Sequence, residues 1–252
     1  MEELSAIGPG LQMALLVGGG LMAGVINTLA GGGSLLTVPL LVVMGLPGTL
    51  ANGTNRVGIL LQSLSATWSF QSAGFSERRT VLRVLIPVAA GALLGAVGIS
   101  HVPDEVFERI FGGLMLVLLV PLLRPHRPEA GSSVRWSPPV AALAFFAIGA
   151  YAGAIQAGVG LPLPMALLHA GHDVVRANAI KVAVIGVATL LAVPVFAVQG
   201  QIAWLPALAL GVGFAAGGVL GARIAVRGGD RVVRPVLAVA VLLLSARMLG
   251  VY

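Results

Sequence analysis

The sequence predicts an all-α integral membrane protein made of two inverted-topology repeats. Three observations predict this fold: an extremely apolar composition, an internal duplication and alternating loop charge. Of the 252 residues, 58% are hydrophobic and 10% are charged, and the mean hydropathy is +1.00. Soluble domains average about 25% charged residues. Because so few charges cannot cover a water-facing surface, we expect the chain to lie in a lipid bilayer.

Five apolar runs occupy each half of the chain, so each repeat has about five helical segments. We expect a first transmembrane repeat at 1–123, a cytoplasmic linker at 124–139 and a second repeat at 140–252, all within one transmembrane domain. The run 160–171 is short for the roughly 20 residues that a spanning helix needs. Either all ten runs cross fully, or the first two of each half form a re-entrant pair. The runs lie near 11–30, 34–48, 52–72, 82–100, 106–123, 140–157, 160–171, 175–198, 203–222 and 232–250.

The duplication becomes visible when the chain is aligned with itself at an offset of 126 residues. Asn52 then meets Asn178, and Phe70 meets Phe196. The block "AAGALLGA" (89–96) meets "AAGGVLGA" (215–222) with six identities. Since this block shares its offset with both asparagines, chance matching of common residues does not explain it, and a tandem duplication does.

Loop charge indicates that the second repeat is inverted with respect to the first. The basic residues Arg78, Arg79 and Arg83 have no counterparts in 198–204, whereas the mainly acidic 100–109 corresponds to the arginine-rich 223–234. Cytoplasmic loops carry an excess of lysine and arginine. Inverted repeats place twelve of the fifteen basic residues inside, with both termini on the extracytoplasmic side. We therefore attribute the net charge of +6 to topology and expect no nucleic-acid partner.

Each repeat contains a helix break at a matching place. The first is "NTLAGGGSLLTVP" (27–39) and the second is "IQAGVGLPLPM" (155–165), with Asn27 and Gln156 as polar residues upstream. Irregular backbone at membrane depth is tolerated where it lines a cavity, and a helix that restarts there directs free N–H groups at it. The breaks therefore predict an anion site, with close helix packing as the alternative.

A second matched pair of segments follows the breaks. "LANGTNR" (50–56) aligns with "RANAIKV" (176–182), so that each half offers an asparagine and a cation, namely Asn52 with Arg56 and Asn178 with Lys181. These side chains are candidates for anion binding. The alternative for the two cations is snorkelling to the membrane interface. Downstream, Gln62 and Ser63 either line a pathway or bond to backbone.

The apolar runs lack acidic residues and cysteine, and this disfavours several classes of function. Every aspartate and glutamate falls in a terminus, a loop or a run end, which argues against a cation carrier or a carboxylate proton relay. Cysteine is absent, and we expect no metal and no cofactor. A membrane-embedded enzyme would have to use Ser34, His101, His169 or His172, so we expect none. The glycine pairs Gly91-x-x-x-Gly95 and Gly217-x-x-x-Gly221 predict close helix packing.

The segment "AGVINTLAGGGSLLTVPLLVVMGLPGTLANGTNRV" (23–57) resembles the first signature of the TauE/SafE sulfite exporter family. The second copy, 152–182, resembles the degenerate repeat of that family: it retains only Gly158 and Gly160 of the glycine run and has Ile180 in place of the threonine. The resemblance covers nearly the whole chain. It implies a multi-pass permease of the bacterial inner membrane that exports sulfite, sulfonates such as sulfoacetate or related organic anions. It also implies that the motif residues, Gly53 among them, lie near the site.

We therefore predict a secondary transporter that acts as an exporter, and whose partners are a small anion and the lipid bilayer. An anion channel remains the alternative, and the oligomeric state, a homodimer included, stays open. The substrate is expected near the midplane, between the repeats. The predicted substrate-binding residues are Asn27, Gly31, Gly32, Gly33, Ser34, Asn52, Thr54, Asn55, Arg56, Gln156, Gly158, Gly160, Asn178 and Lys181.

Overall fold

The structure is a computed structural model that describes residues 8–123, 137–160, 162–169 and 171–227. Within these ranges all regular structure is helical, as predicted. The run 232–250 and most of the linker lie outside the described residues. The first half contains α2 (Pro9–Ala30), α3 (Ser34–Val43), α4 (Gly48–Ser72), α5 (Arg78–Ser100) and α6 (Asp104–Leu123), and the second contains α7 (Pro138–Ala154), α8 (Pro162–His169), α9 (Val174–Val198) and α10 (Trp204–Val226).

Helix length separates full crossings from partial ones. Among the described helices, α2, α5, α9 and α10 are long and apolar enough to cross a membrane. By contrast, α3 has 10 residues and α8 has 8, so at 1.5 Å per residue they reach only about 15 Å and 12 Å. A hydrocarbon core is about 30 Å thick. The second and seventh runs therefore do not cross as full helices, and the alternative of ten full crossings is wrong.

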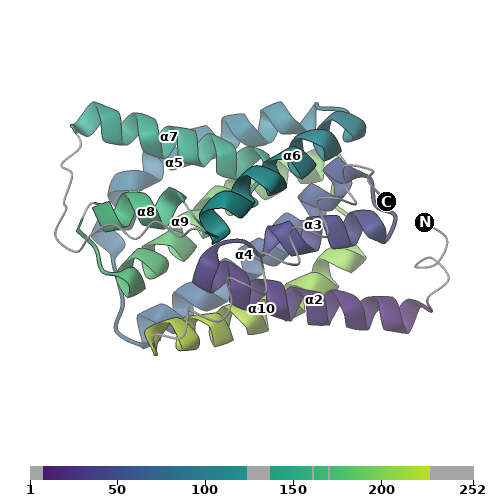
Figure 1. The fold of residues 1–252 in the computed structure, drawn as a ribbon, viewed down its shortest axis with the longest axis horizontal. Coiled ribbons are helices and arrows are strands. Elements are labelled where there is room, and N and C mark those ends of the chain that lie inside the picture. Colours follow the sequence, from purple (N-terminus) through teal and green to yellow (C-terminus); the bar gives the residue numbers. More distant parts are fainter. Residues whose placement is uncertain (1–7, 124–136, 161, 170, 228–252) are drawn as a thin grey trace.

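Helices of the first half pack mainly against helices of the second half (Figure 1). Helix α2 of the first half lies along α10 of the second, and α7 of the second half lies along α5 of the first. Between these two pairs, α4 packs against α9. At the 126-residue offset α2 corresponds to α7, and α10 corresponds to α5, so the α2–α10 pair is the counterpart of the α7–α5 pair. Helices α4 and α9 correspond to each other, and this arrangement is the one expected of a duplicated chain. The inverted orientation of the halves stays a prediction.

Glycine makes these pairings close. A Cβ atom added to Gly95 on α5 would overlap the carbonyl oxygen of Ala150 on α7. A Cβ atom on Gly217 of α10 would overlap the carbonyl oxygen of Leu21 on α2. Because backbone lies directly against backbone at both contacts, the predicted packing role of the two small-xxx-small motifs is confirmed.

Loops that the charge pattern assigns to one membrane side lie together. On the predicted cytoplasmic side, Arg176 pairs with Glu77 at 3.4 Å. On the opposite side, the backbone N–H of Thr49 donates to Asp104 at 2.8 Å, and the amide of Gln201 donates to the carbonyl oxygen of Ser100 at 2.9 Å. The side of the membrane that each set faces stays a prediction.

Candidate functional site

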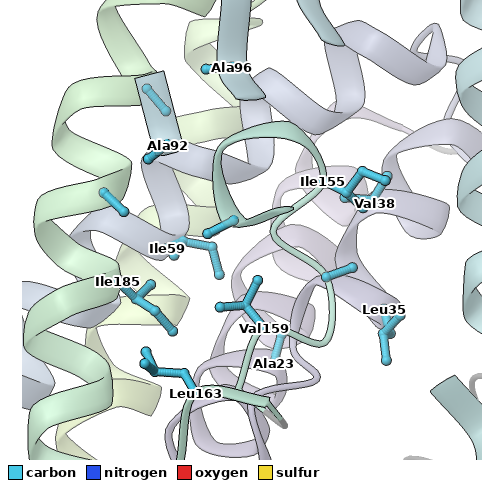
Figure 2. Packing of buried hydrophobic residues seen from close by; sticks show 14 of the residues in the cluster. Ala23, Leu35, Val38, Ile59, Ala92, Ala96, Ile155, Val159, Leu163 and Ile185 are labelled. Carbon is cyan, nitrogen blue, oxygen red and sulfur yellow. The ribbon is translucent and has the colours of Figure 1, made fainter. Parts of the chain in front are cut away.

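The two helix breaks meet in the interior of the protein. A Cβ atom on Gly31 would overlap the Cα atom of Gly160, and one on Gly160 would overlap the Cα atom of Gly31. Figure 2 shows Ile155, Val159 and Leu163 of the second break among the buried side chains of α3 and α4, with which they form one apolar cluster. The structure thus joins two segments that lie about half the chain apart.

The first break presents backbone N–H groups that have no hydrogen-bond partner among the described residues. Gly31 has φ +76° and ends α2, its own N–H donating to the carbonyl oxygen of Asn27 at 2.9 Å. The next three residues, Gly32, Gly33 and Ser34, are buried, and no group in the described part of the chain accepts a hydrogen bond from their N–H groups. Buried N–H groups without a partner are rare in native proteins. Successive N–H groups of this kind form a concave site suited to an anion.

The second break contains a residue in a strained backbone conformation. Gln156 has φ +67°, and among the described residues it is the one non-glycine residue with a positive φ. Left-handed conformations of side-chain-bearing residues are costly and cluster at functional sites. The side-chain oxygen of Gln156 accepts hydrogen bonds from Arg56 at 3.3 Å and from Thr189 at 3.4 Å. Pro162 and Pro164 deprive α8 of N–H groups that α3 retains, so the two breaks differ as donors.

Arg56 is fully buried, with 0% of its surface exposed. From α4 it donates to the carbonyl oxygen of Ala152 at 3.0 Å and to that of Gly153, which lie in the last turn of α7. Its guanidinium carbon lies 4.6 Å from the ring centre of Phe196, a cation–π distance. Its Nε atom has no partner in the described residues.

Lys181 of α9 makes the reciprocal contact with the first half. It is also 0% exposed, and its ammonium group donates to the carbonyl oxygens of Asn27 at 3.1 Å and Thr28 at 2.7 Å. These carbonyls lie near the end of α2. A cation is favoured there by the negative end of the helix dipole. Both predicted cations are thus buried helix caps, and the snorkelling alternative is wrong because neither side chain reaches the surface.

Amide side chains connect the breaks to α4. Asn27 donates to Gln62 at 2.7 Å, and Gln62 donates in turn to Thr28 at 2.7 Å. On the other side of the break, Asn55 donates to the hydroxyl of Ser34 at 2.9 Å. Thr37 donates to Asn55 and was not among the predicted site residues.

The remaining predicted residues differ in whether they contact one of the breaks. Asn52 is buried and donates to the carbonyl oxygen of Ala154 at 2.9 Å, while its amide oxygen has no partner in the described residues. Gly158 has φ +75° and packs against Leu118 of α6. Asn178 is buried within α9, with 5% of its surface exposed. Thr54 accepts a hydrogen bond from the N–H of Ala203 at 2.9 Å, which ties it to the loop between α9 and α10 instead of to a break.

Sequence reasoning missed three threonines of this region, namely Thr28, Thr37 and Thr189. A threonine in an apolar helix gives little signal, because it commonly bonds to the preceding turn, as Thr28 does to Gly24. The buried polar residues of the described chain include no aspartate or glutamate. No group of three or more candidate metal ligands lies within these residues either.

Comparisons with known proteins identify the family of this chain. The family model described as "Sulfite exporter TauE/SafE" matches residues 16–248. The chain belongs to the TauE/SafE sulfite exporter family. This assignment confirms the resemblance seen in the sequence, and the breaks described above fall within the matched range. No solved structure matches the chain significantly.

Curated relatives of this TauE/SafE chain extend along nearly its whole length. It is 30% identical over 241 residues to "Probable membrane transporter protein ORF9" of Sinorhizobium sp., covering 94% of this chain and 92% of the relative. It is 27% identical to a "Probable membrane transporter protein" of Haemophilus influenzae, covering 94% of each chain. It is 26% identical to "Probable membrane transporter protein YfcA" of Escherichia coli K12, covering 91% and 86%. The protein is therefore a multi-pass membrane transporter.

Proposed function

We propose that the protein is a secondary transporter that exports a small sulfur-containing anion, such as sulfite or sulfoacetate, or a related organic anion. The substrate binds where the two helix breaks meet. In this proposal the protein lies in the bacterial inner membrane with both termini outside. The family supplies the substrate class, and the charge distribution of the site supports the preference for an anion.

The observation that carries the proposal is buried positive charge without a buried counterion. Arg56 and Lys181 are both fully buried, and among the described residues neither forms an ion pair, since Arg176 is the cation in both of the ion pairs that those residues form. A buried charge is costly unless it is paired. Helix-end carbonyls compensate these cations only partly, because each helix end carries about half an elementary charge. An anionic substrate would supply the missing negative charge.

Donors remain available for such an anion. The N–H groups of Gly32, Gly33 and Ser34 have no acceptor among the described residues. Arg56 retains its Nε–H, and Lys181 uses two acceptors where an ammonium offers three N–H groups. Export also has a driving force, because a negative-inside potential of 100 mV expels one negative charge with about 2.3 kcal/mol.

Flux of radiolabelled sulfite and sulfoacetate into proteoliposomes tests this proposal, with protein-free liposomes as the blank. A pair of substitutions at one position tests the N–H groups. Ser34→Pro removes the N–H group at the first position of α3, where proline fits a helix, and Ser34→Ala removes only the hydroxyl. We expect Ser34→Pro to lower flux about tenfold below Ser34→Ala, equivalent to about 1.4 kcal/mol of lost binding. Equal flux in the two variants would exclude the N–H group of Ser34 from the site.

A countertransport measurement separates the carrier from the channel. Unlabelled substrate inside the vesicles should accelerate uptake of the labelled anion through a carrier. Flux that does not saturate and is not stimulated in this way would show a channel instead. Absence of flux of any of these anions would reject the proposed substrate class.

A further inference from the structure

A crevice of about 220 Å³ opens between the end of α4, the start of α5 and α9. Its polar rim includes Gln71, Glu77 and Arg78, and its deeper walls include Phe70 and Ala179. Glu77 on the rim pairs with Arg176 of α9. The crevice thus lies between the two halves, on the side that the loop charges assign to the cytoplasm.

Phe70 forms the inner end of this crevice. It is 1% exposed and belongs to a small apolar cluster, separate from the main core, that includes Leu29, Ala66 and Val182. Leu29 lies in the last turn of α2, and Val182 follows Lys181 in the sequence. The cluster therefore adjoins both the crevice and the capped end of α2 at the first break. Its other buried members are alanine, leucine and valine, and Phe75 packs against it while partly buried. The ring of Phe70 is therefore the bulkiest buried side chain of the cluster.

The second half carries the same aromatic residue in the corresponding place. Phe196 lies 126 residues after Phe70 and is 0% exposed. The guanidinium group of Arg56 lies over the ring of Phe196. The same group caps the end of α7 at the second break. Each phenylalanine thus adjoins one of the two capped breaks, from opposite ends of the α4–α9 pair.

The approach to Phe196 is covered where the approach to Phe70 is open. Gly53 corresponds to Ala179 of the crevice wall at the repeat offset, and a Cβ atom on Gly53 would overlap the carbonyl oxygen of Gln201. The loop that contains Gln201 is anchored by two hydrogen bonds, from Ala203 to Thr54 at 2.9 Å and from Gln201 to Ser100 at 2.9 Å. This loop therefore occupies the position that corresponds to the crevice.

We propose that Phe70 and Phe196 are the inner and outer gates of the transport path, and that the crevice is its cytoplasmic mouth. This inference rests on the proposed transport function and adds to it a route and a conformational state. The structure then represents a state with both gates closed, the inner vestibule open and the outer one filled by the Gln201 loop. Repeat transporters alternate between such states by exchanging the conformations of their halves.

The chain has no cysteine, so single cysteines can be introduced without altering the background. Thr67 lines the crevice, and Val193 is its counterpart in the second half. Thr67→Cys should react with a membrane-impermeant maleimide in inside-out vesicles and not in intact cells. Val193→Cys should react with the reagent from neither side. Labelling of Thr67→Cys only from outside, or equal labelling of both cysteines, would overturn the assignment of the mouth.

The inner gate is tested at Ala66, which lies one helical turn before Phe70 on α4. Ala66 is fully buried beside Phe70, so Ala66→Cys should react slowly in inside-out vesicles. Adding Phe70→Ala should raise its labelling rate about tenfold, because the barrier between the vestibule and position 66 is removed. Leu82→Ala, at an apolar residue that lines the crevice and does not belong to the Phe70 cluster, is the control and should leave the rate within about twofold. An equal rise with both variants, or no rise with Phe70→Ala, would overturn the gate.

These readouts do not depend on the substrate. The expected labelling pattern together with an absence of anion flux would retain the gates and reject the proposed substrate class. Anion flux together with a failed labelling pattern would retain the transport proposal and reject the gates.

Discussion

The ammonium nitrogen of Lys181 lies 2.7 Å from the carbonyl oxygen of Thr28, although 153 residues separate the two in sequence. Arg56 makes the corresponding contact in the other direction, with Ala152 at 3.0 Å. Each half of the protein therefore stabilises the helix end at which the break of the other half begins. The site is held together by contacts between the repeats, and substitutions at these contacts should affect stability and transport together.

Lys181→Met should destabilise the protein by about 1–3 kcal/mol, because it leaves two buried carbonyl oxygens of α2 without their cation. It should also lower anion flux more than Lys181→Arg, which keeps the charge. Thermal unfolding in detergent and proteoliposome flux measure the two effects. The control is Arg176→Met, at an exposed cation of the same helix, which should change stability by at most about 0.5 kcal/mol. Equal effects of the two methionine variants would contradict the capping role.

Gly31→Ala should be far more harmful than Gly45→Ala. Both glycines have a positive φ, +76° and +96°, so both variants bear a strain of about 1–2 kcal/mol. A Cβ atom on Gly31 would also overlap Gly160, whereas one on Gly45 has open space. Thermal unfolding should therefore show a small loss for Gly45→Ala and a large loss for Gly31→Ala. A similar loss in both would mean that the two breaks are not in contact.

Gly95→Ala and Gly98→Ala test the contact between α5 and α7 in the same way. A Cβ atom on Gly95 would overlap the backbone of Ala150, and one on Gly98 would meet nothing within 4 Å. Alanine favours a helix over glycine by about 1 kcal/mol, so Gly98→Ala should be neutral or stabilising. Gly95→Ala should lower the unfolding temperature, because α5 must move away from α7. Equal unfolding temperatures of the two variants would rule out the close contact.

Substitutions at Gln156 should separate backbone strain from side-chain function. Gln156→Gly and Gln156→Val both remove the acceptor for Arg56 and Thr189, so both should lower anion flux. Glycine adopts a positive φ freely, whereas a β-branched residue does not. We expect Gln156→Val to be less stable than Gln156→Gly by about 1–2 kcal/mol in thermal unfolding. A valine variant as stable as the glycine variant would show that the backbone here is not strained.

Most of the fold was predictable from apolar runs, and its exceptions have local causes. The predicted run 11–30 agrees closely with α2 (Pro9–Ala30). The run 34–48 instead ends as a helix at Val43, because the chain turns through Gly45 with φ +96°. Likewise the helix predicted over 140–157 ends at Ala154. The chain turns at Gln156, which has a positive φ and lies two residues before Gly158, the first glycine of the second break.

The residues of the candidate site could be selected from the sequence, but their contacts could not be predicted, and their role in binding an anion stays a prediction. The glycine breaks, Asn27, Gln156 and both cations were identified because they lie in matching segments of the two halves. The acceptors of Arg56 and Lys181 were not, because a cation seven or eight residues inside a helix can either be buried or reach the interface, and only tertiary packing decides. The contact of Arg56 with Phe196 likewise depends on how α4 and α9 cross, which no local pattern encodes.

The reciprocal caps also bear on how the protein is made. When α2 enters the membrane during synthesis, Lys181 has not yet been translated, and the end of α2 lacks its cation until α9 emerges from the ribosome. Likewise Arg56 is translated before the end of α7, whose carbonyl groups it caps. As parts of one polypeptide, the two halves always supply each other's caps, whereas two separate chains could make the same contacts only as partner subunits. The two caps are not copies of each other, because Arg56 corresponds to Val182 and Lys181 corresponds to Asn55 at the 126-residue offset.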